Sequence, residues 1–95
     1  QETHERSNKL KQLETESRKL QQTQIWIETP YRNTAMLMAC IQSLAPQTLL
    51  CLGIDLSLPS EFISTLSIAQ WRKLYPNEAA CNSLQNRPTV FLLLA

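Results

Sequence analysis

Glycine is almost absent from this 95-residue chain, since Gly53 is its only one. A site that binds a nucleotide or a related cofactor usually needs several glycines, because the backbone must approach phosphate or adenosine closely. The sequence contains neither a G-x-G-x-x-G motif nor a P-loop. Either the chain does not bind such ligands alone, or the glycine-rich half of the site lies outside it.

Histidine and cysteine are too few and too scattered for a catalytic or metal cluster. The single histidine, His4, lies in a polar segment, and Cys40, Cys51 and Cys81 form no C-x-x-C pair. No Ser-His-Asp or Cys-His set can be assembled, so no catalytic residue can be assigned and nucleophilic catalysis is not expected. Three separated cysteines indicate buried thiols in a reducing cytoplasm, and we predict no metal site.

Charge of one sign and long apolar runs are also lacking. The formal net charge is +1, which gives no electrostatic reason to expect nucleic-acid binding. No apolar run approaches the roughly 20 residues of a membrane span, so we expect no membrane association. The length fits one small domain, residues 1–95.

Apolar periodicity predicts helices alternating with strands. Residues 1–22 are predicted to form a polar helix with Leu10, Leu13 and Leu20 on one face and with Ser7 positioned to cap its start. Its basic residues alternate with acidic ones, Glu14 among them, which predicts a solvated helix face. The further expected elements are a strand at 24–28, a helix ending at 44, a strand at 48–54, an edge strand at 62–66, a helix at 68–74 and a central strand at 90–94. Long connections that contain helices favour parallel strands. The sequence thus predicts an α/β fold with a small mixed, mostly parallel β-sheet of about four strands flanked by helices.

The predicted strands are nearly continuous in apolar residues, which is typical of strands buried on both faces. We therefore expect one buried sheet to contain Ile25, Ile27, Leu50, Leu52, Val90 and Leu92. Gly53, near the end of the second strand, indicates a bulge or a close approach to the backbone.

A charged turn follows the first strand, with Glu28 and Arg32 on either side of Pro30. Thr29 or Asn33 is positioned to cap the next helix. Ligands of open α/β sheets bind at the carboxyl ends of strands, so this turn is the first place to look for chemistry. Glu28 fits a base or a cofactor contact, or simply an ion pair with Arg32. Arg32 fits a substrate phosphate, or an ion pair with Glu28 or Asp55.

The turn Glu28-Thr29-Pro30-Tyr31-Arg32 resembles the E-S-P-H-R turn of the tetrapyrrole-methylase-like family, the class III methyltransferases that use S-adenosylmethionine. It is most similar to the branch of the bacterial small-subunit ribosomal-RNA 2′-O-ribose methyltransferase. Three later segments fit the same template in order. Residues 49–57 match the family's apolar strand and R-E-L-T-K, residues 59–71 its F-E-E and G-T-L-x-E-L segment, and residues 87–89 its K-G-E ending.

The resemblance implies that this chain is the C-terminal domain of a two-domain methyltransferase whose N-terminal, glycine-rich cofactor domain is not included. The whole protein would be an enzyme, and this part alone would be inactive. This part would help to close the cleft for cofactor and substrate. The methyl acceptor would be a ribose on ribosomal RNA or a tetrapyrrole carbon. A non-enzymatic dimerisation or protein-interaction module is the alternative.

The resemblance also assigns residues. The cofactor would be held largely by backbone at strand ends, at Glu28, Thr29, Leu52, Gly53, Pro88 and Thr89. The substrate would contact Arg32, Asp55 and Ser57. The family's domain has one further strand before its first helix, and without it a sheet edge stays unpaired. We therefore expect a partner at that edge, the N-terminal domain or a second copy in a homodimer.

Overall fold

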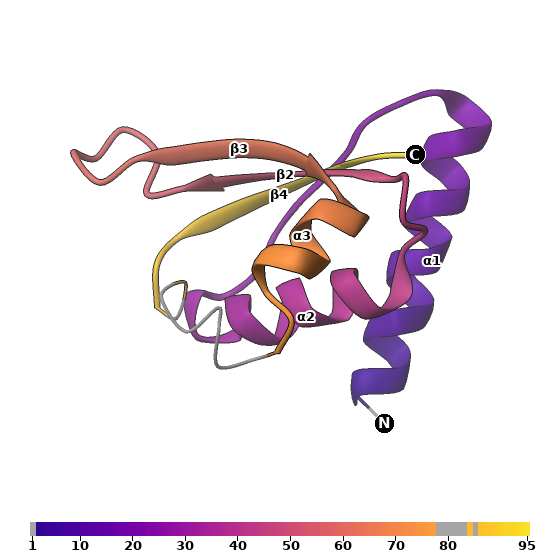
Figure 1. Ribbon diagram of the computed structural model, residues 1–95, viewed down its shortest axis with the longest axis horizontal. Helices are drawn as coiled ribbons and strands as arrows, with labels where there is room; N and C mark the ends of the chain where they lie inside the picture. The colour runs from indigo at the N-terminus through magenta and orange to yellow at the C-terminus, as the bar shows by residue number, and fades with distance from the viewer. Residues whose placement is uncertain (1, 78–83, 85) are drawn as a thin grey trace.

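The computed structural model describes residues 2–77, 84 and 86–95, in which helices pack on one side of a β-sheet (Figure 1). The elements are α1 (Glu2–Leu20), β1 (Gln24–Ile27), the 3-10 turn η1 (Pro30–Arg32), α2 (Asn33–Ser43), β2 (Leu49–Ile54), β3 (Phe62–Ser67), α3 (Ile68–Leu74) and β4 (Thr89–Leu94). Each predicted helix and strand therefore has a counterpart. The polar segment at 77–87 lies mostly outside the described residues.

The strand order is β1-β4-β2-β3, and every neighbouring pair is antiparallel. The prediction of a mostly parallel sheet is therefore wrong. β1 and β2 do run in the same direction, because each is antiparallel to β4. The connection through α2 thus joins two strands that run in the same direction, as expected. In the sheet, however, β4 lies between β1 and β2. The predicted central place of β4 and edge place of β3 are confirmed.

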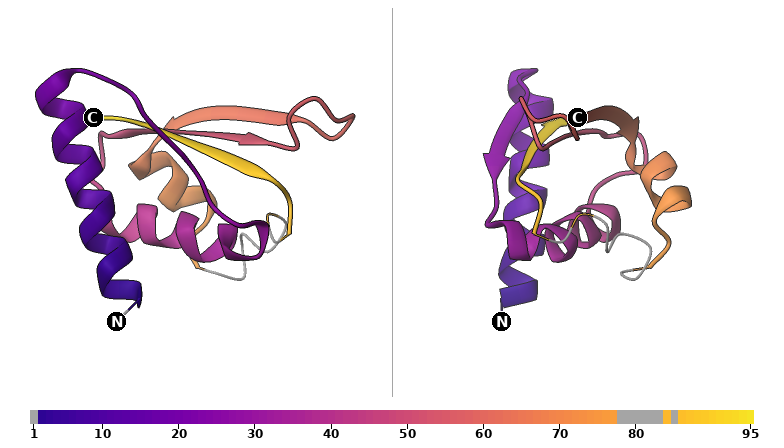
Figure 2. Two further views of the ribbon diagram at one scale, coloured as in Figure 1. Left: turned by 180° about the vertical axis from the view of Figure 1, so that it is seen from behind. Right: turned by 90° about the vertical axis from the view of Figure 1, so that its left-hand side faces the viewer.

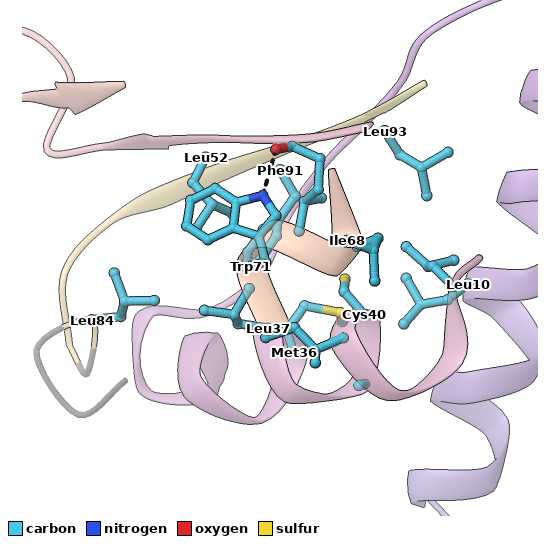
Figure 3. Close-up of a cluster of buried hydrophobic side chains, with 14 of the residues drawn as sticks. Leu10, Met36, Leu37, Cys40, Leu52, Ile68, Trp71, Leu84, Phe91 and Leu93 are labelled. Atoms are coloured by element: carbon cyan, nitrogen blue, oxygen red, sulfur yellow. Dashed lines mark hydrogen bonds between the residues drawn. The ribbon is translucent and has the colours of Figure 1, made fainter. Parts of the chain in front are cut away.

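One face of the sheet forms the core against the helices. Leu50 and Leu52 of β2 and Phe91 and Leu93 of β4 are at most 1% exposed, and they pack with Trp71 (Figure 3). The Trp71 Nε1 group donates a hydrogen bond of 2.8 Å to the Leu50 carbonyl oxygen. α2 and α3 both lie beneath this concave side of the sheet (Figure 2).

The opposite face is open, which corrects the burial expected from the sequence. Ile25 and Ile27 are 65% and 73% exposed, and Val90 and Leu92 are only half-buried. The burial prediction is wrong for these four residues. An uninterrupted apolar run carries no period of two, so it does not reveal which residues point inward.

Helix α1 is anchored by polar groups as well as by Leu10, which is 2% exposed. The buried Glu14 carboxylate accepts hydrogen bonds from the Ala45 N–H, at 2.8 Å, and from the Thr48 hydroxyl. Its place in an alternating run of charges had predicted a solvated position. Ser7 is not a cap, because α1 already begins at Glu2, and its hydroxyl contacts that of Ser43. None of the described helices has the length and apolar content needed to cross a membrane.

Candidate functional site

The turn that leaves β1 is shaped by Pro30. Thr29 is extended, with φ −61° and ψ 139°, as expected for a residue before proline, and η1 begins directly after it. Thr29 makes no capping hydrogen bond with its side chain, and Asn33 is already the first residue of α2. The prediction that one of them caps the helix is therefore wrong.

Asn33 instead joins α2 to the start of β4. Its fully buried side-chain amide donates to the Arg87 carbonyl oxygen and, at 3.1 Å, to the Thr89 hydroxyl. The Thr89 hydroxyl in turn donates to the Arg87 carbonyl oxygen at 3.0 Å. These contacts fix the segment that enters β4 beside the turn that leaves β1. No local sequence pattern predicts these contacts, because the partners are more than 50 residues apart.

A hollow of about 210 Å³ lies where β1 and β2 end and β4 begins. We call it the strand-end pocket. Its lining includes four of the six predicted cofactor residues, Glu28, Gly53, Pro88 and Thr89. The other lining residues are Ile27, Pro30, Leu56 and Val90. Because β1 and β2 run in the same direction, their carboxyl ends meet at one edge of the sheet, as the sequence argument required.

The remaining two predicted cofactor residues do not line this pocket. The side chain of Leu52 is 1% exposed and belongs to the core. Thr29 is exposed and lies between two residues that do line it.

Because Gly53 has no side chain, the Leu56 side chain can approach its backbone closely. This confirms the close approach, one of the two alternatives predicted for Gly53. A Cβ atom there would lie 3.3 Å from the Leu56 Cδ2 atom, so the Leu56 side chain covers the glycine. The register of β2 with β3 and with β4 is unbroken at this position, so there is no bulge.

A second hollow, of about 360 Å³, lies on the other side of the same turn. It shares Ile27 and Glu28 with the strand-end pocket, and it contains the predicted substrate residue Arg32. Its other lining residues are charged and apolar side chains of α1 together with two apolar residues outside that helix: Glu5, Arg6, Lys9, Leu10, Leu13, Trp26 and Met36. Glu28 thus lies between two hollows, which places it where a ligand of either one can reach it.

Asp55 and Ser57, the other predicted substrate residues, shape the β2–β3 loop and line neither hollow. Both have left-handed backbone conformations, with φ 52° and 70°. The Asp55 carboxylate binds the Arg87 guanidinium and the Ser60 hydroxyl, each at 2.8 Å. Their substrate role stays a prediction, and the contacts show that Asp55 fixes this loop beside the strand-end pocket.

These contacts predict a pH dependence of stability. The hydrogen bond from Ser60, and then that from Arg87, holds the pKa of Asp55 below its usual range. The unfolded chain therefore binds a proton first as the pH falls through about 4, and the free energy of unfolding decreases below that pH. In Asp55→Asn this contribution should be missing, so urea unfolding between about pH 3 and pH 7 should show a shallower acid loss. Exposed Glu16→Gln is the control, and equal acid slopes in Asp55→Asn and the unchanged chain would contradict the prediction.

Groups for metal or thiol chemistry do not gather at this site. No cluster of three histidine, cysteine, aspartate or glutamate side chains occurs in the part of the chain that the structure describes. Cys40 is fully buried, which raises the pKa of its thiol. Cys81 and the His4 side chain lie outside the described part.

Comparison with known proteins identifies the fold but not the family. No family model and no curated protein matches the sequence. In structure the chain is similar to a crystal structure of the methyltransferase CobJ, with a TM-score of 0.51 and 17% sequence identity. The match covers 90% of this chain and 34% of that one. The chain thus has the fold of part of a methyltransferase and spans about a third of its length.

Proposed function

We propose that this chain is the C-terminal part of an S-adenosylmethionine-dependent methyltransferase of the tetrapyrrole-methylase-like type. In this role it supplies one wall of the cleft for cofactor and substrate. The observation that carries the proposal is the strand-end pocket. Glu28, Gly53, Pro88 and Thr89 were assigned to the cofactor by resemblance alone, and they come from three separate segments to line one hollow.

The size of this pocket fits part of a cofactor site. Complete small-molecule pockets usually exceed about 300 Å³, and the strand-end pocket has about 210 Å³. The Thr89 hydroxyl is already bound to Asn33 and Arg87. The Thr89 hydroxyl is therefore engaged, and this chain would bind the cofactor mainly through backbone groups at the strand ends. A glycine-rich domain would provide the remaining contacts.

S-adenosylmethionine would supply a methyl group activated by its sulfonium, so the chain needs no nucleophile of its own. The work left to the protein is to orient two substrates and exclude water. Ile27, Leu56 and Val90 give the pocket apolar walls. Arg32, in the neighbouring hollow, would bind an anionic group of the methyl acceptor.

The acceptor is either a ribose on ribosomal RNA or a tetrapyrrole carbon, and one assay separates them. The full-length protein would be incubated with labelled S-adenosylmethionine and either undermethylated ribosomes or a tetrapyrrole. Transfer to ribosomes supports the RNA branch, and transfer to the tetrapyrrole alone contradicts it. Transfer to neither would contradict both assignments.

The 95-residue chain alone should not bind S-adenosylmethionine measurably. It holds a minority of the contacts, and binding must first offset several kcal/mol of lost translational and rotational freedom. Calorimetric titration with about 1 mM cofactor, where a dissociation constant corresponds to about −4 kcal/mol, should give no binding heat. Tight binding would show that these residues form a complete site and would overturn the proposal.

A further inference from the structure

The hollow of about 360 Å³ that α1 shares with the end of β1 and the start of α2 is large enough to hold a small molecule by itself. We call it the α1 hollow. Pockets for small molecules usually measure between about 300 and 1,000 Å³. The strand-end pocket is smaller than this range, whereas the α1 hollow reaches it without a further domain.

One side of α1 forms a wall of the α1 hollow. Glu5, Lys9 and Leu13 line it at intervals of four residues, and residues at this spacing lie along one side of a helix. The opposite side anchors the helix, where Ser7 contacts α2 and Glu14 binds the segment between α2 and β2. The wall is therefore fixed before a ligand arrives, which lowers the entropy cost of binding.

The lining of the α1 hollow combines apolar surface with an excess of positive charge. Five of its ten lining residues are apolar, three are cationic and two are anionic. Apolar walls with a few polar groups are typical of sites for small organic molecules. The cationic excess favours a negatively charged ligand, and the two carboxylates would repel a ligand with several negative charges. The lining therefore fits an apolar molecule with a single anionic group.

Trp26 adds a hydrogen-bond donor to this lining. Its ring stacks on Phe91 with centroids 5.3 Å apart, and its buried Nε1–H group has no acceptor among the described residues. The Nε1–H group of Trp71, in contrast, donates to the Leu50 carbonyl oxygen. An indole N–H can only donate, and a buried donor without an acceptor costs free energy. An anionic oxygen of a ligand in the α1 hollow would supply this acceptor.

We propose that the α1 hollow is a binding site for a small amphipathic anion, a molecule with an apolar ring or chain and one carboxylate, sulfonate or phosphate group. Its apolar part lies against Leu10 and Leu13, and its anionic group binds Lys9 and the Trp26 Nε1–H group. The site itself does not depend on the methyltransferase assignment. Only the identification of this anion with the methyl acceptor rests on the proposed function.

Nuclear magnetic resonance on the isotope-labelled 95-residue chain tests the site with three probes. A naphthalene sulfonate should shift the indole N–H resonance of Trp26 with a dissociation constant of about 1 mM. The resonance of Trp71, whose N–H is already bonded, should not shift. Inorganic phosphate lacks the apolar part and naphthylmethylammonium has the opposite charge, so each should bind at least about 10-fold more weakly.

Two results of this titration would overturn the proposal. One is equal binding of the sulfonate and the ammonium probe, because the site would then not select an anion. The other is a set of shifts confined to the open face of the sheet, for example at Leu92, with the Trp26 resonance unchanged.

Two charge reversals on α1 test the role of Lys9. Lys9→Glu should weaken binding of the sulfonate at least about 10-fold, because an attraction becomes a repulsion. Lys11→Glu makes the same change in net charge at an exposed residue of the same helix that does not line the α1 hollow. Its affinity should stay within about twofold of the unchanged chain. Equal losses in the two variants would show a general charge effect and would overturn the proposal.

A competition experiment on the full-length protein separates this site from the proposed function. The sulfonate should compete with the methyl acceptor and leave the affinity for S-adenosylmethionine within about twofold. Sulfonate binding that depends on Lys9 would support the site even if the full-length protein bound no S-adenosylmethionine. Failure of the sulfonate to bind, with S-adenosylmethionine binding intact, would overturn the site and leave the proposed function standing.

Discussion

Phe91→Ala is expected to lower the free energy of unfolding by about 3–5 kcal/mol, and Leu92→Ala by about 1 kcal/mol or less. Phe91 is fully buried on the inner face, and its ring stacks on Trp26 with centroids 5.3 Å apart. Leu92, the next residue, points to the open face and is half-buried. A domain of this size has a total stability of only about 5–14 kcal/mol, so the first loss would unfold a weak domain in part.

Urea unfolding followed by tryptophan fluorescence measures both losses. Leu92→Ala serves as the matched control, because it truncates the neighbouring position of the same strand. Similar losses in the two variants would show that the outer face is buried in the monomer. That result would contradict the assignment of the two faces of the sheet.

Gly53→Val should reduce S-adenosylmethionine binding and methyl transfer by the full-length protein at least about 100-fold, the loss expected when a ligand position is blocked. A Cβ atom at this position already lies 3.3 Å from Leu56, and the further methyl groups of valine would occupy the strand-end pocket. Valine is favoured in strands, so a loss of binding would come from the filled pocket and not from a disturbed strand.

Cys51→Val is the control for this variant. It introduces the same side chain on the same strand and face, at a residue that does not line the strand-end pocket. Labelled methyl transfer should persist in Cys51→Val and be lost in Gly53→Val, while both proteins unfold at temperatures close to that of the unchanged protein. Normal transfer by Gly53→Val would remove the strand-end pocket from the cofactor site.

Local signals in the sequence predicted the elements well, because their causes are local. Ser67 caps α3, and its side chain and that of Gln70 form a reciprocal capping box. Pro30 sets the turn after β1. The order of the strands in the sheet, in contrast, has no local cause. The insertion of β4 between β1 and β2 depends on packing across the whole chain, and no pattern within one strand carries that information.

The candidate site shows the same division. Glu28, Gly53, Pro88 and Thr89 were grouped by the family resemblance, and the fold brings them together because β1 and β2 end where the antiparallel strand β4 begins. The contacts that hold these strand ends together could not be predicted from the sequence. Asp55 pairs with Arg87 over a separation of 32 residues. Asn33 looked like a cap from its residue type, and only the fold shows that it binds the start of β4.

The most direct test of the account is parallel calorimetry with S-adenosylmethionine on the full-length protein and on the 95-residue chain. The account predicts binding by the full-length protein and no measurable heat from the short chain. Binding by the short chain, or its absence in the full-length protein, would contradict the claim that these residues form one wall of a shared cofactor site.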